Sequence, residues 1–312
     1  MSRALHLTAP AKLNLGLRVV GRRGDGYHLL ETVMHPLSLH DDLWMEAAAG
    51  GFELEVMASS ERARAPDGPG NLVVRGMRAV AELSGYEGGL RCRLHKRIPT
   101  GAGLGGGSSD AAAALRLSRA LIGGDLSEED IRRAARSLGA DVPFFLAGGT
   151  RLARGIGDEL EPWSVEPRVF LLVVPPFECP TKDVYKTLAA ELNLAPGQAS
   201  IESASGPRFG ACDREVRGPL VNDLEAAAER VRPELGSLRQ RIVDLGFPGV
   251  SMSGSGSTLF LCFGDLGAAE GAAKRLRVLA AGGVDLLLAT SGDEFLSPPE
   301  PCRWPGRPEG RP

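Results

Sequence analysis

Residues 99–110 read Pro-Thr-Gly-Ala-Gly-Leu-Gly-Gly-Gly-Ser-Ser-Asp and join a segment that alternates like a strand (90–98) to an alanine-rich segment typical of a helix (109–122). The five glycines of this stretch permit positive φ angles and let the backbone approach a ligand closely. A helix start also carries unpaired N–H groups and the positive end of the helix dipole. The stretch 99–109, called the glycine loop below, therefore predicts a cradle for phosphate groups.

A linker without a ligand and two other phosphate-binding patterns are the alternatives for the glycine loop. A linker is disfavoured because a clear strand and a clear helix flank the loop directly. Gly101, Gly103 and Gly106 satisfy the dinucleotide fingerprint G-x-G-x-x-G, which needs a second strand ending in an acidic residue about 20 positions on. Here a Gly-Gly turn and another helix follow, which disfavours a nicotinamide-dependent oxidoreductase. The pattern G-x-x-x-x-G-K-[ST] needs a lysine that the loop lacks.

The composition is that of a globular protein without a nucleic-acid or membrane partner. Of the 312 residues 43% are hydrophobic and 24% are charged, and the formal net charge of -3 does not indicate binding to a polyanion. The five cysteines lack metal-ligand spacing, and the first ten residues do not resemble a signal peptide. No apolar run approaches the roughly 18 residues of a membrane span. We therefore expect a cytoplasmic protein with reduced thiols.

Strand and helix patterns mix along the chain without a steady βαβ repeat, which favours an α+β fold of two domains. We place the boundary near Trp163, which gives an N-terminal domain of residues 1–163, a C-terminal domain of residues 164–296 and a disordered Pro-rich tail at 297–312. The expected strands are 8–20, 29–39, 52–57, 90–98, 168–174, the end of 249–263, and 285–289. The expected helices are 71–83, 109–122, 127–138, 183–192, 222–231, 234–245 and 268–279. Residues 195–218 form a polar connection without a pattern.

Three segments together resemble the GHMP kinases, the superfamily of galactokinase and of homoserine, mevalonate and phosphomevalonate kinases. The glycine loop resembles the central ATP motif, Ala9-Pro-Ala-Lys-Leu-Asn-Leu15 the first motif, and Ser251-Met-Ser-Gly-Ser-Gly-Ser257 the third. The resemblance implies ATP and Mg²⁺ as cofactors. It also implies the two-domain GHMP kinase fold, in which the N-terminal domain has a left-handed crossover, like domain 2 of ribosomal protein S5, and the C-terminal domain is ferredoxin-like.

Four further segments narrow the resemblance to one family of these kinases: Lys12-Leu-Asn14, Gly24-Asp-Gly-Tyr-His28, Leu138-Gly-Ala-Asp-Val-Pro-Phe144 and Asn222-Asp-Leu-Glu225. They are similar to the 4-diphosphocytidyl-2-C-methyl-D-erythritol kinases of non-mevalonate isoprenoid biosynthesis. This resemblance implies transfer of the γ-phosphate of ATP to the 2-hydroxyl of a substrate that carries a cytidine diphosphate group. Two alternative functions remain on the same fold. One is a GHMP kinase of the mevalonate or homoserine type, and the other is a non-catalytic nucleotide-binding regulator.

The resemblance also implies the roles of single residues in phosphate transfer. Asp141 is the candidate base for the hydroxyl proton, and Lys12 is its partner, which keeps the carboxylate ionised and offsets phosphate charge. Without the resemblance, Asp141 would more often be a turn residue and Lys12 a solvated strand lysine. The residues expected to contact ATP are Pro99, Thr100, Gly101, Ala102, Gly103, Leu104, Gly105, Gly106, Gly107, Ser108, Ser109 and, near the adenine, Asn71.

The substrate-binding residues implied by the resemblance come from several segments. Asn14 shares the strand face of Lys12 and is assigned to the acceptor hydroxyl. Tyr27 is expected to stack on cytosine with Tyr185 on the opposite face, while His28 bonds the polar edge of the base. Further contacts are expected from Thr181, Gly254 and Ser255. No carboxylate pair indicates a dedicated metal cage, so no metal ligand is predicted. A monomer or homodimer is expected.

Overall fold

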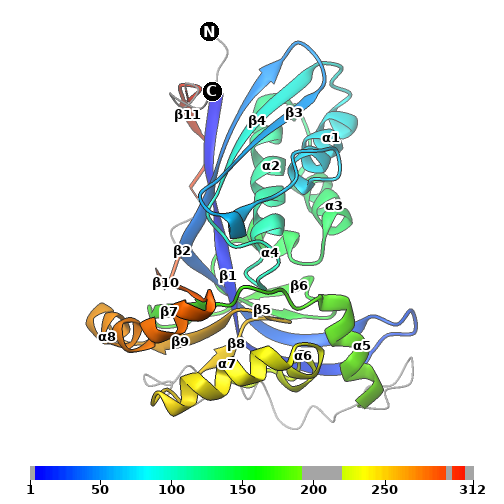
Figure 1. The fold of residues 1–312 in the computed structure, drawn as a ribbon. Coiled ribbons are helices and arrows are strands. Elements are labelled where there is room, and N and C mark those ends of the chain that lie inside the picture. Colours follow the sequence, from blue (N-terminus) through cyan, green and yellow to red (C-terminus); the bar gives the residue numbers. More distant parts are fainter. Residues whose placement is uncertain (1–3, 192–219, 293–296, 306–312) are drawn as a thin grey trace.

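The computed structural model describes residues 4–191, 220–292 and 297–305, which form two sheets with helices packed on them (Figure 1). The first sheet has the strand order β11-β1-β2-β4-β3, and β5 and β6 extend it from β2. Its pairings are antiparallel except that of β3 with β4. The strands are β1 (Ala4–Arg22), β2 (His28–Ala48), β3 (Phe52–Ala58), β4 (Gly89–Lys96), β5 (Arg151–Arg154), β6 (Glu159–Pro162) and β11 (Glu300–Cys302).

Four helices lie on one side of the first sheet (Figure 1): α1 (Leu72–Ser84), α2 (Gly106–Ile122), α3 (Glu128–Leu138) and α4 (Val142–Ala147). Two of them begin at side-chain caps. Asn71 accepts a hydrogen bond from Val73 N before α1, and Ser127 and Asp130 form a capping box at the start of α3. The core between helices and sheet contains Leu43, Met45, Met77, Leu90, Leu94 and Leu117. The helices thus bury their apolar faces on the sheet, as the periodicity of the sequence predicted.

The second sheet is antiparallel and has the order β10-β7-β9-β8. Its strands are β7 (Val169–Val174), β8 (Ser251–Met252), β9 (Leu259–Phe263) and β10 (Asp285–Thr290). Its helices are α5 (Thr181–Glu191), α6 (Glu225–Val231), α7 (Pro233–Asp244), α8 (Leu266–Leu276) and the 3₁₀ helix η2 (Arg277–Gly282). The chain order β7, helices, β8, β9, α8, β10 is the βαββαβ sequence of a ferredoxin-like domain. The expected α+β class is confirmed.

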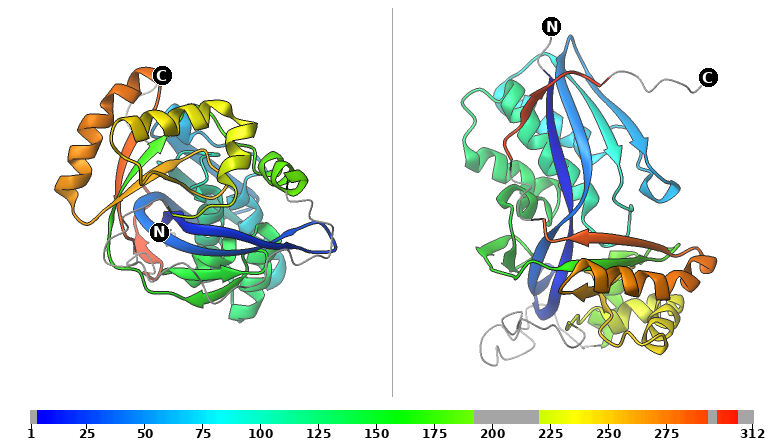
Figure 2. Two further views of the ribbon diagram at one scale, coloured as in Figure 1. Left: turned by 90° about the horizontal axis from the view of Figure 1, so that it is seen from below. Right: turned by 90° about the vertical axis from the view of Figure 1, so that its left-hand side faces the viewer.

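Strand β1 belongs to the packing of both halves of the molecule. The long β1–β2 hairpin runs from the first sheet down to the second domain (Figure 2). Leu13 packs in one cluster with Phe170 of β7, and Leu17 packs in another with Leu171. Successive residues of β7 therefore face the first domain and the helices of the second domain in turn. We propose a domain boundary between β6 and β7, with β1 shared across it.

Several short elements were not predicted from the sequence, and several expected boundaries were wrong, among them the end of the strand expected at 29–39, which continues as β2 to Ala48. Strands β5 and β6 and helix α4 were not predicted. Helix α2 begins at Gly106 rather than at Ser109, because Gly105 takes the left-handed conformation that precedes the first turn. The polar connection at 195–218 lies outside the described residues. Within the described ranges, no helix combines the length and the apolar character needed to cross a bilayer.

The expectation of a disordered tail is wrong for residues 297–305. Glu300–Cys302 form β11, which pairs antiparallel with the first residues of β1. The ring of Trp304 then lies under two guanidinium groups, 4.9 Å from that of Arg91 and 5.4 Å from that of Arg93. Residues 297–305 are therefore held by pairing with the open edge of β1 and by the two cation–π contacts of Trp304. Residues 306–312 lie outside the described part.

Candidate active site

The glycine loop is hydrogen-bonded to both domains. Lys12 N on β1 donates to Leu104 O at 2.9 Å. Ala102 O accepts from Thr258 N at 3.1 Å, and Gly103 O accepts from Ser253 Oγ at 3.1 Å. Lys12 belongs to the first resembling motif and Ser253 to the third, and Thr258 directly follows the third, so the three motifs meet in space at one site.

Close approach to the second domain is what requires glycine in the loop. A Cβ at Gly103 would lie 2.6 Å from Ser253 O and 2.7 Å from Gly256 O, and Gly103 has a φ of +77°. Gly105, with a φ of +71°, would place a Cβ 3.0 Å from Cγ of Lys12. Side chains at these two positions would therefore separate the loop from the elements that flank it.

The loop lines a cavity of about 210 Å³ at the start of α2, which we call the donor cavity. Its lining comprises Leu72, Lys96, Pro99, Thr100, Gly101, Ala102, Gly103, Leu104, Gly105, Gly106, Gly107 and Ser108. The first N–H groups of a helix have no intrahelical acceptor and carry the positive end of its dipole. The donor cavity therefore offers backbone donors and the Ser108 side chain to an anion.

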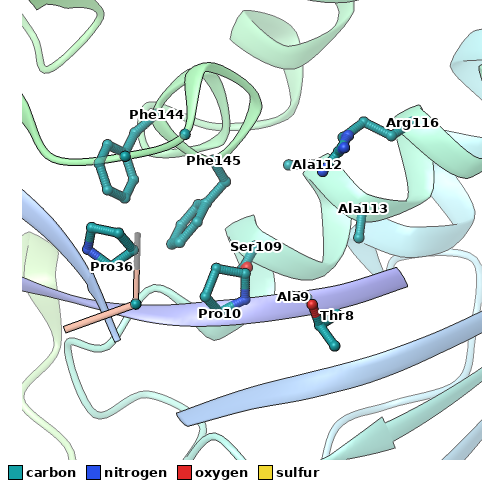
Figure 3. A pocket seen from close by; sticks show the side chains of 13 residues that line it. Thr8, Ala9, Pro10, Pro36, Ser109, Ala112, Ala113, Arg116, Phe144 and Phe145 are labelled. Carbon is teal, nitrogen blue, oxygen red and sulfur yellow. The ribbon is translucent and has the colours of Figure 1, made fainter. Parts of the chain in front are cut away.

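Two residues expected at the nucleotide do not line the donor cavity. The hydroxyl of Ser109 is buried, has no hydrogen-bond partner among the described residues, and lines a cavity of only about 20 Å³ with Pro10 and Phe145 (Figure 3). The side chain of Asn71 caps α1 through Val73 N and donates to Pro66 O. Its neighbour Leu72 takes a place in the cavity lining instead.

Lys12 and Asp141 face each other next to the glycine loop. Lys12 Nζ lies 3.8 Å from Asp141 Oδ2 and donates to Asn14 Oδ1 at 2.6 Å. Burial lowers the pKa of Lys12, and the Asp141 carboxylate opposes that shift. Asp141 is the residue before α4, where the following Val142-Pro143 starts a new helix. The structure thus brings together the two residues that the sequence assigned to phosphate transfer.

Asn14 is held in place by a chain of hydrogen bonds. Its Nδ2 donates to Thr32 Oγ1 at 2.9 Å, and the Thr32 hydroxyl donates to Gly16 O at 2.6 Å. Its Oδ1 is thereby directed at Lys12, and a Cβ on Gly254 would lie 3.1 Å from that oxygen. Lys12, Asn14, Asp141 and Gly254 line a central cavity of about 160 Å³, whose other walls include Gly103, Gly105, Thr181, Tyr185 and Ser255.

A larger cavity of about 1080 Å³ continues from the central cavity, and we call it the acceptor cavity. The two share Asp141, Thr181 and Tyr185 in their walls. Tyr27 and His28 line the acceptor cavity from the β1–β2 turn, and Tyr185 does so from α5. The donor, central and acceptor cavities therefore form one path with Lys12 and Asp141 in its middle.

The aromatic pair in the acceptor cavity consists of His28 and Tyr185. Their rings stack with centroids 5.1 Å apart and planes 29° apart. His28 Nε2 is buried without a hydrogen-bond partner in the described part of the chain, and burial, aided by Arg22, lowers the pKa of the ring. Burial raises the pKa of the Tyr185 hydroxyl. Tyr27 is 63% exposed at the mouth of the cavity, so the structure brings His28 rather than Tyr27 against Tyr185.

The turn between β8 and β9 closes the central cavity. Ser255 Oγ lies 2.8 Å from Thr181 Oγ1, which joins the turn to the start of α5. Asn222 Nδ2 donates to Met252 O and to Gly254 O, each at 2.9 Å. Asn222 was part of a quoted motif but was not assigned to the site. Its place in the Asn-Asp-Leu-Glu segment was the only signal that could have suggested it.

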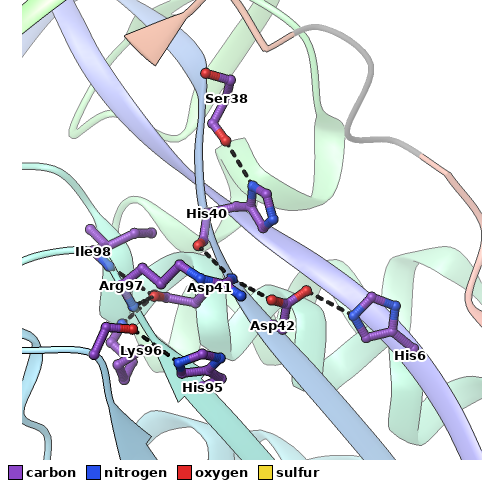
Figure 4. A network of polar contacts seen from close by, with 10 residues as sticks. His6, Ser38, His40, Asp41, Asp42, His95, Lys96, Arg97 and Ile98 are labelled. Carbon is purple, nitrogen blue, oxygen red and sulfur yellow. Dashed lines mark hydrogen bonds and ion pairs between the residues drawn. The ribbon is translucent and has the colours of Figure 1, made fainter. Parts of the chain in front are cut away.

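A buried ionic cluster beside the glycine loop was not predicted from the sequence, and Figure 4 shows two of its members, Asp41 and Lys96. Lys96, at the end of β4, donates to Asp110 Oδ2 at 2.7 Å and pairs with Asp41 of β2. Burial and the neighbouring Asp41 raise the pKa of Asp110 to about 7, against the pull of Lys96. Asp41 Oδ1 also accepts from Ile98 N at 2.9 Å. The cluster ties the strand before the loop to the helix after it.

Among the described residues no group of three or more His, Cys, Asp or Glu side chains could hold a metal ion by itself. A magnesium ion that arrives with a nucleotide needs less, because phosphate oxygens and water fill most of its octahedral shell. The Ser108 hydroxyl in the donor cavity and the Asp141 carboxylate in the central cavity are oxygen ligands of the required kind. The Ser108 hydroxyl lines the donor cavity itself, so the chemistry of that cavity fits a magnesium–nucleotide complex without a contribution from Asp141.

Two family models and several solved structures match this chain. The model of the GHMP kinases N terminal domain matches residues 71–149, and that of the GHMP kinases C terminal domain matches residues 208–279. A crystal structure of a 4-(cytidine 5'-diphospho)-2C-methyl-D-erythritol kinase is 38% identical, covers 92% of this chain and 99% of its own, and superposes with a TM-score of 0.74. A homoserine kinase from Cytophaga hutchinsonii, 20% identical, covers 95% and 96% with a TM-score of 0.70, which shows the fold alone.

Curated relatives match most of the chain. The 4-diphosphocytidyl-2-C-methyl-D-erythritol kinase of Pelotomaculum thermopropionicum is 40% identical over 271 residues, which is 86% of this chain and 92% of the relative. The enzyme of that name from Thermus thermophilus is 42% identical over 252 residues, or 81% and 85%. The chain therefore belongs to the 4-diphosphocytidyl-2-C-methyl-D-erythritol kinase family of the GHMP kinases.

Proposed function

We propose that this chain transfers the γ-phosphate of ATP to the 2-hydroxyl of 4-diphosphocytidyl-2-C-methyl-D-erythritol. The observation that carries the proposal is the position of Lys12 and Asp141 between two cavities of different character. On one side lies the glycine loop with its backbone donors, and on the other the stacked His28–Tyr185 pair. A kinase of this kind needs three parts next to one another in space: a phosphate-binding loop, then a catalytic base, then a pocket for a nucleobase.

The Asp141 carboxylate is proposed to accept the proton of the acceptor hydroxyl. The hydroxyl oxygen then forms a bond to the γ-phosphorus, the bond from that phosphorus to the β–γ bridging oxygen breaks, and ADP leaves with the electron pair. Lys12 holds its ammonium 3.8 Å from the carboxylate, where it is proposed to stabilise negative charge on the transferred group. When bound, Mg²⁺ neutralises phosphate charge.

Recognition of the cytidine group is assigned to the acceptor cavity. Tyr185 and His28 offer aromatic faces, and the buried Nε2 of His28 is a polar atom for the edge of a base. Tyr27 also lines the acceptor cavity and is proposed to offer a second aromatic face to the base. Asn14 and Thr181 line the central cavity and are proposed to orient the methylerythritol hydroxyls.

All of these residues come from one chain, so the proposed site is complete in a monomer and in each half of a homodimer. The proposed ligand is a small molecule, and no assigned contact involves nucleic acid or a membrane. Cys92, Cys179 and Cys302 are free thiols in the described part of the chain. We propose a reducing cytoplasmic setting on that basis.

A coupled assay of ADP release tests the proposal directly. Purified protein with ATP and Mg²⁺ is offered 4-diphosphocytidyl-2-C-methyl-D-erythritol, mevalonate or homoserine in separate reactions, beside an Asp141→Ala variant. We expect turnover with the cytidyl substrate alone and its loss in the variant. Turnover with mevalonate or homoserine instead would assign the chain to another branch of the GHMP kinases. Folded protein that binds ATP yet leaves the cytidyl substrate unchanged would refute the proposal.

A further inference from the structure

Arg62 connects the second domain to the first residues of the glycine loop. It belongs to the 3₁₀ helix η1 (Glu61–Ala63), in the polar segment between β3 and α1. The segment leaves the first sheet where Ser59 N donates to Lys96 O at 2.9 Å. Ala63 is fully buried, which fixes η1 against the body of the molecule. Neither the resembling motifs nor the mechanism above uses any residue of this segment.

The guanidinium of Arg62 makes all of its described contacts with the second domain. Nη1 donates to Val174 O at 2.7 Å and to Pro175 O at 2.6 Å, at the end of β7. Nε lies 2.9 Å from Asp285 Oδ2 at the start of β10, and Nη2 donates to Gly283 O. The planar fork of an arginine can reach several acceptors at once, whereas a lysine ammonium cannot span the same set.

The backbone of the same residue bonds the glycine loop. Arg62 O accepts from Thr100 N at 2.8 Å, and Arg64 O accepts from Thr100 Oγ1 at 3.0 Å. A Cβ on the next residue, Gly101, would lie 2.2 Å from the carboxyl carbon of Glu178, a residue of the second domain. The start of the loop is therefore enclosed between η1 and the second domain.

We propose that Arg62 is a positioning residue for nucleotide binding, which holds the start of the glycine loop at a fixed distance from the second domain. The later part of the loop is already joined to that domain through Ala102 O and Gly103 O. With Arg62 in place both ends are fixed, and the donor cavity keeps its shape before the nucleotide arrives. Without it, binding must also order the loop, which weakens affinity. This inference rests on the proposed nucleotide site.

Nucleotide affinity and amide exchange test the role of Arg62 without any turnover. A non-hydrolysable ATP analogue with Mg²⁺ is titrated by calorimetry into wild type, Arg62→Ala, Arg62→Lys and Arg64→Ala. We expect Kd to rise roughly fivefold or more in both Arg62 variants, in the lower range of measured couplings between sites. Arg64→Ala is the matched control, because the exposed side chain of Arg64 pairs with Glu61 at the surface and has no other hydrogen-bond or ion-pair partner among residues 4–191, 220–292 and 297–305.

Hydrogen exchange at the Thr100 amide provides the second readout, and we expect it to be faster in Arg62→Ala than in Arg64→Ala. With both substrates present, KM for ATP should rise more than kcat falls, and KM for the acceptor should stay near its wild-type value. Wild-type affinity together with wild-type exchange in Arg62→Ala would overturn the proposal. If Arg62→Ala fails to melt cooperatively, the test passes to Arg62→Lys and Asp285→Asn. An unchanged Kd of the ATP analogue in both of these variants would refute the role of Arg62. Wild-type protein that binds the ATP analogue yet does not turn over the cytidyl substrate would instead refute the proposed function.

Discussion

Lys12 Nζ and Asp141 Oδ2 lie 3.8 Å apart, and the two side chains differ in exposure, at 5% and 37%. The lysine is buried under the glycine loop, whereas the carboxylate opens toward the acceptor cavity. Because burial lowers the pKa of Lys12 and Asp141 opposes that shift, the carboxylate also helps the lysine keep its charge. Removing Asp141 therefore weakens two parts of the site at once.

Replacement of Asp141, the proposed catalytic base, should abolish most of the turnover but leave nucleotide binding intact. In Asp141→Asn we expect kcat to fall on the order of 10²–10⁴-fold, the usual contribution of a positioned base. The Kd of a non-hydrolysable ATP analogue should change little, since Asp141 does not line the donor cavity. Asp125→Asn, at an exposed turn, is the control. A kcat close to that of the control would mean that another group takes the proton.

Loss of the aromatic face in the acceptor cavity should weaken binding of the cytidyl substrate selectively. Tyr185→Ala removes the ring that stacks on His28, so its KM for that substrate should rise on the order of tenfold. Tyr185→Phe keeps the face and should stay near wild type. KM for ATP measured in the same variants should not move. An equal rise for both substrates would point to a general distortion instead.

Two glycines of the same loop should respond in opposite ways to alanine. Gly103→Ala forces a Cβ toward the carbonyl oxygens of Ser253 and Gly256 at a positive φ, and we expect a loss of about 1–3 kcal/mol or more in the free energy of unfolding. Gly107 lies in the first turn of α2, where a Cβ would meet only Leu72 at 3.9 Å. Gly107→Ala should be neutral or gain up to about 1 kcal/mol. Urea titrations of both variants give the comparison.

The buried cluster under the loop should make stability depend on pH between about 4 and 7. The pKa of Asp110 is raised in the fold from an ordinary value of 3.8 to about 7, so its contribution to stability is full below pH 4 and is lost as pH rises to 7. The groups that face it are Lys96, Asp41 and Cys92. Asp110→Asn cannot ionise and should lack this loss.

The measurement is a pair of urea titrations of wild type and Asp110→Asn, at pH 5 and at pH 8. Between these values the wild type should lose on the order of one to a few kcal/mol relative to the variant. Ion pairs elsewhere on the surface are shared by both proteins and cancel in the difference. A constant difference between the two proteins would show that Asp110 ionises normally in the fold.

The C-terminal strand should depend on the ring of Trp304. Trp304→Ala removes two cation–π contacts with Arg91 and Arg93, each worth about 0.5–1 kcal/mol at exposed sites. We expect a loss of about 1 kcal/mol and faster hydrogen exchange along β11, while Trp304→Phe should retain part of both. Unchanged exchange would mean that the strand pairing alone holds this segment.

Local sequence rules predicted the elements whose causes are local. The glycine loop between a strand and a helix and the helix expected at 127–138 both depend on neighbouring residues, and the structure has them. Strand β11 and helix α4 were missed because they are short, and their stability comes from what they pack on. The pairing of β11 joins the two ends of the chain, so no window of the sequence contains it.

In the candidate site, too, residues within a local motif could be predicted, whereas features that depend on distant segments could not. Lys12 and Asp141 could be assigned because each stands in a motif, and the structure places them together. Ser109 also stands in a motif, but the direction of its side chain depends on the helix register, which sets it toward α4. The cluster of Lys96, Asp41 and Asp110 draws on three elements, and nothing in the sequence indicates that they meet.

Strand β1 leaves the ribosome long before much of what covers it, because the covering residues lie more than 150 positions further along the chain. Leu17 and Val19 belong to a core whose other members include Leu171, Leu235 and Leu259. Contacts between such distant parts of a chain form slowly, because a long loop must close before they can exist. Until the second domain is made, the apolar end of the hairpin has no native partner, so we expect the nascent N-terminal half to be prone to misfolding.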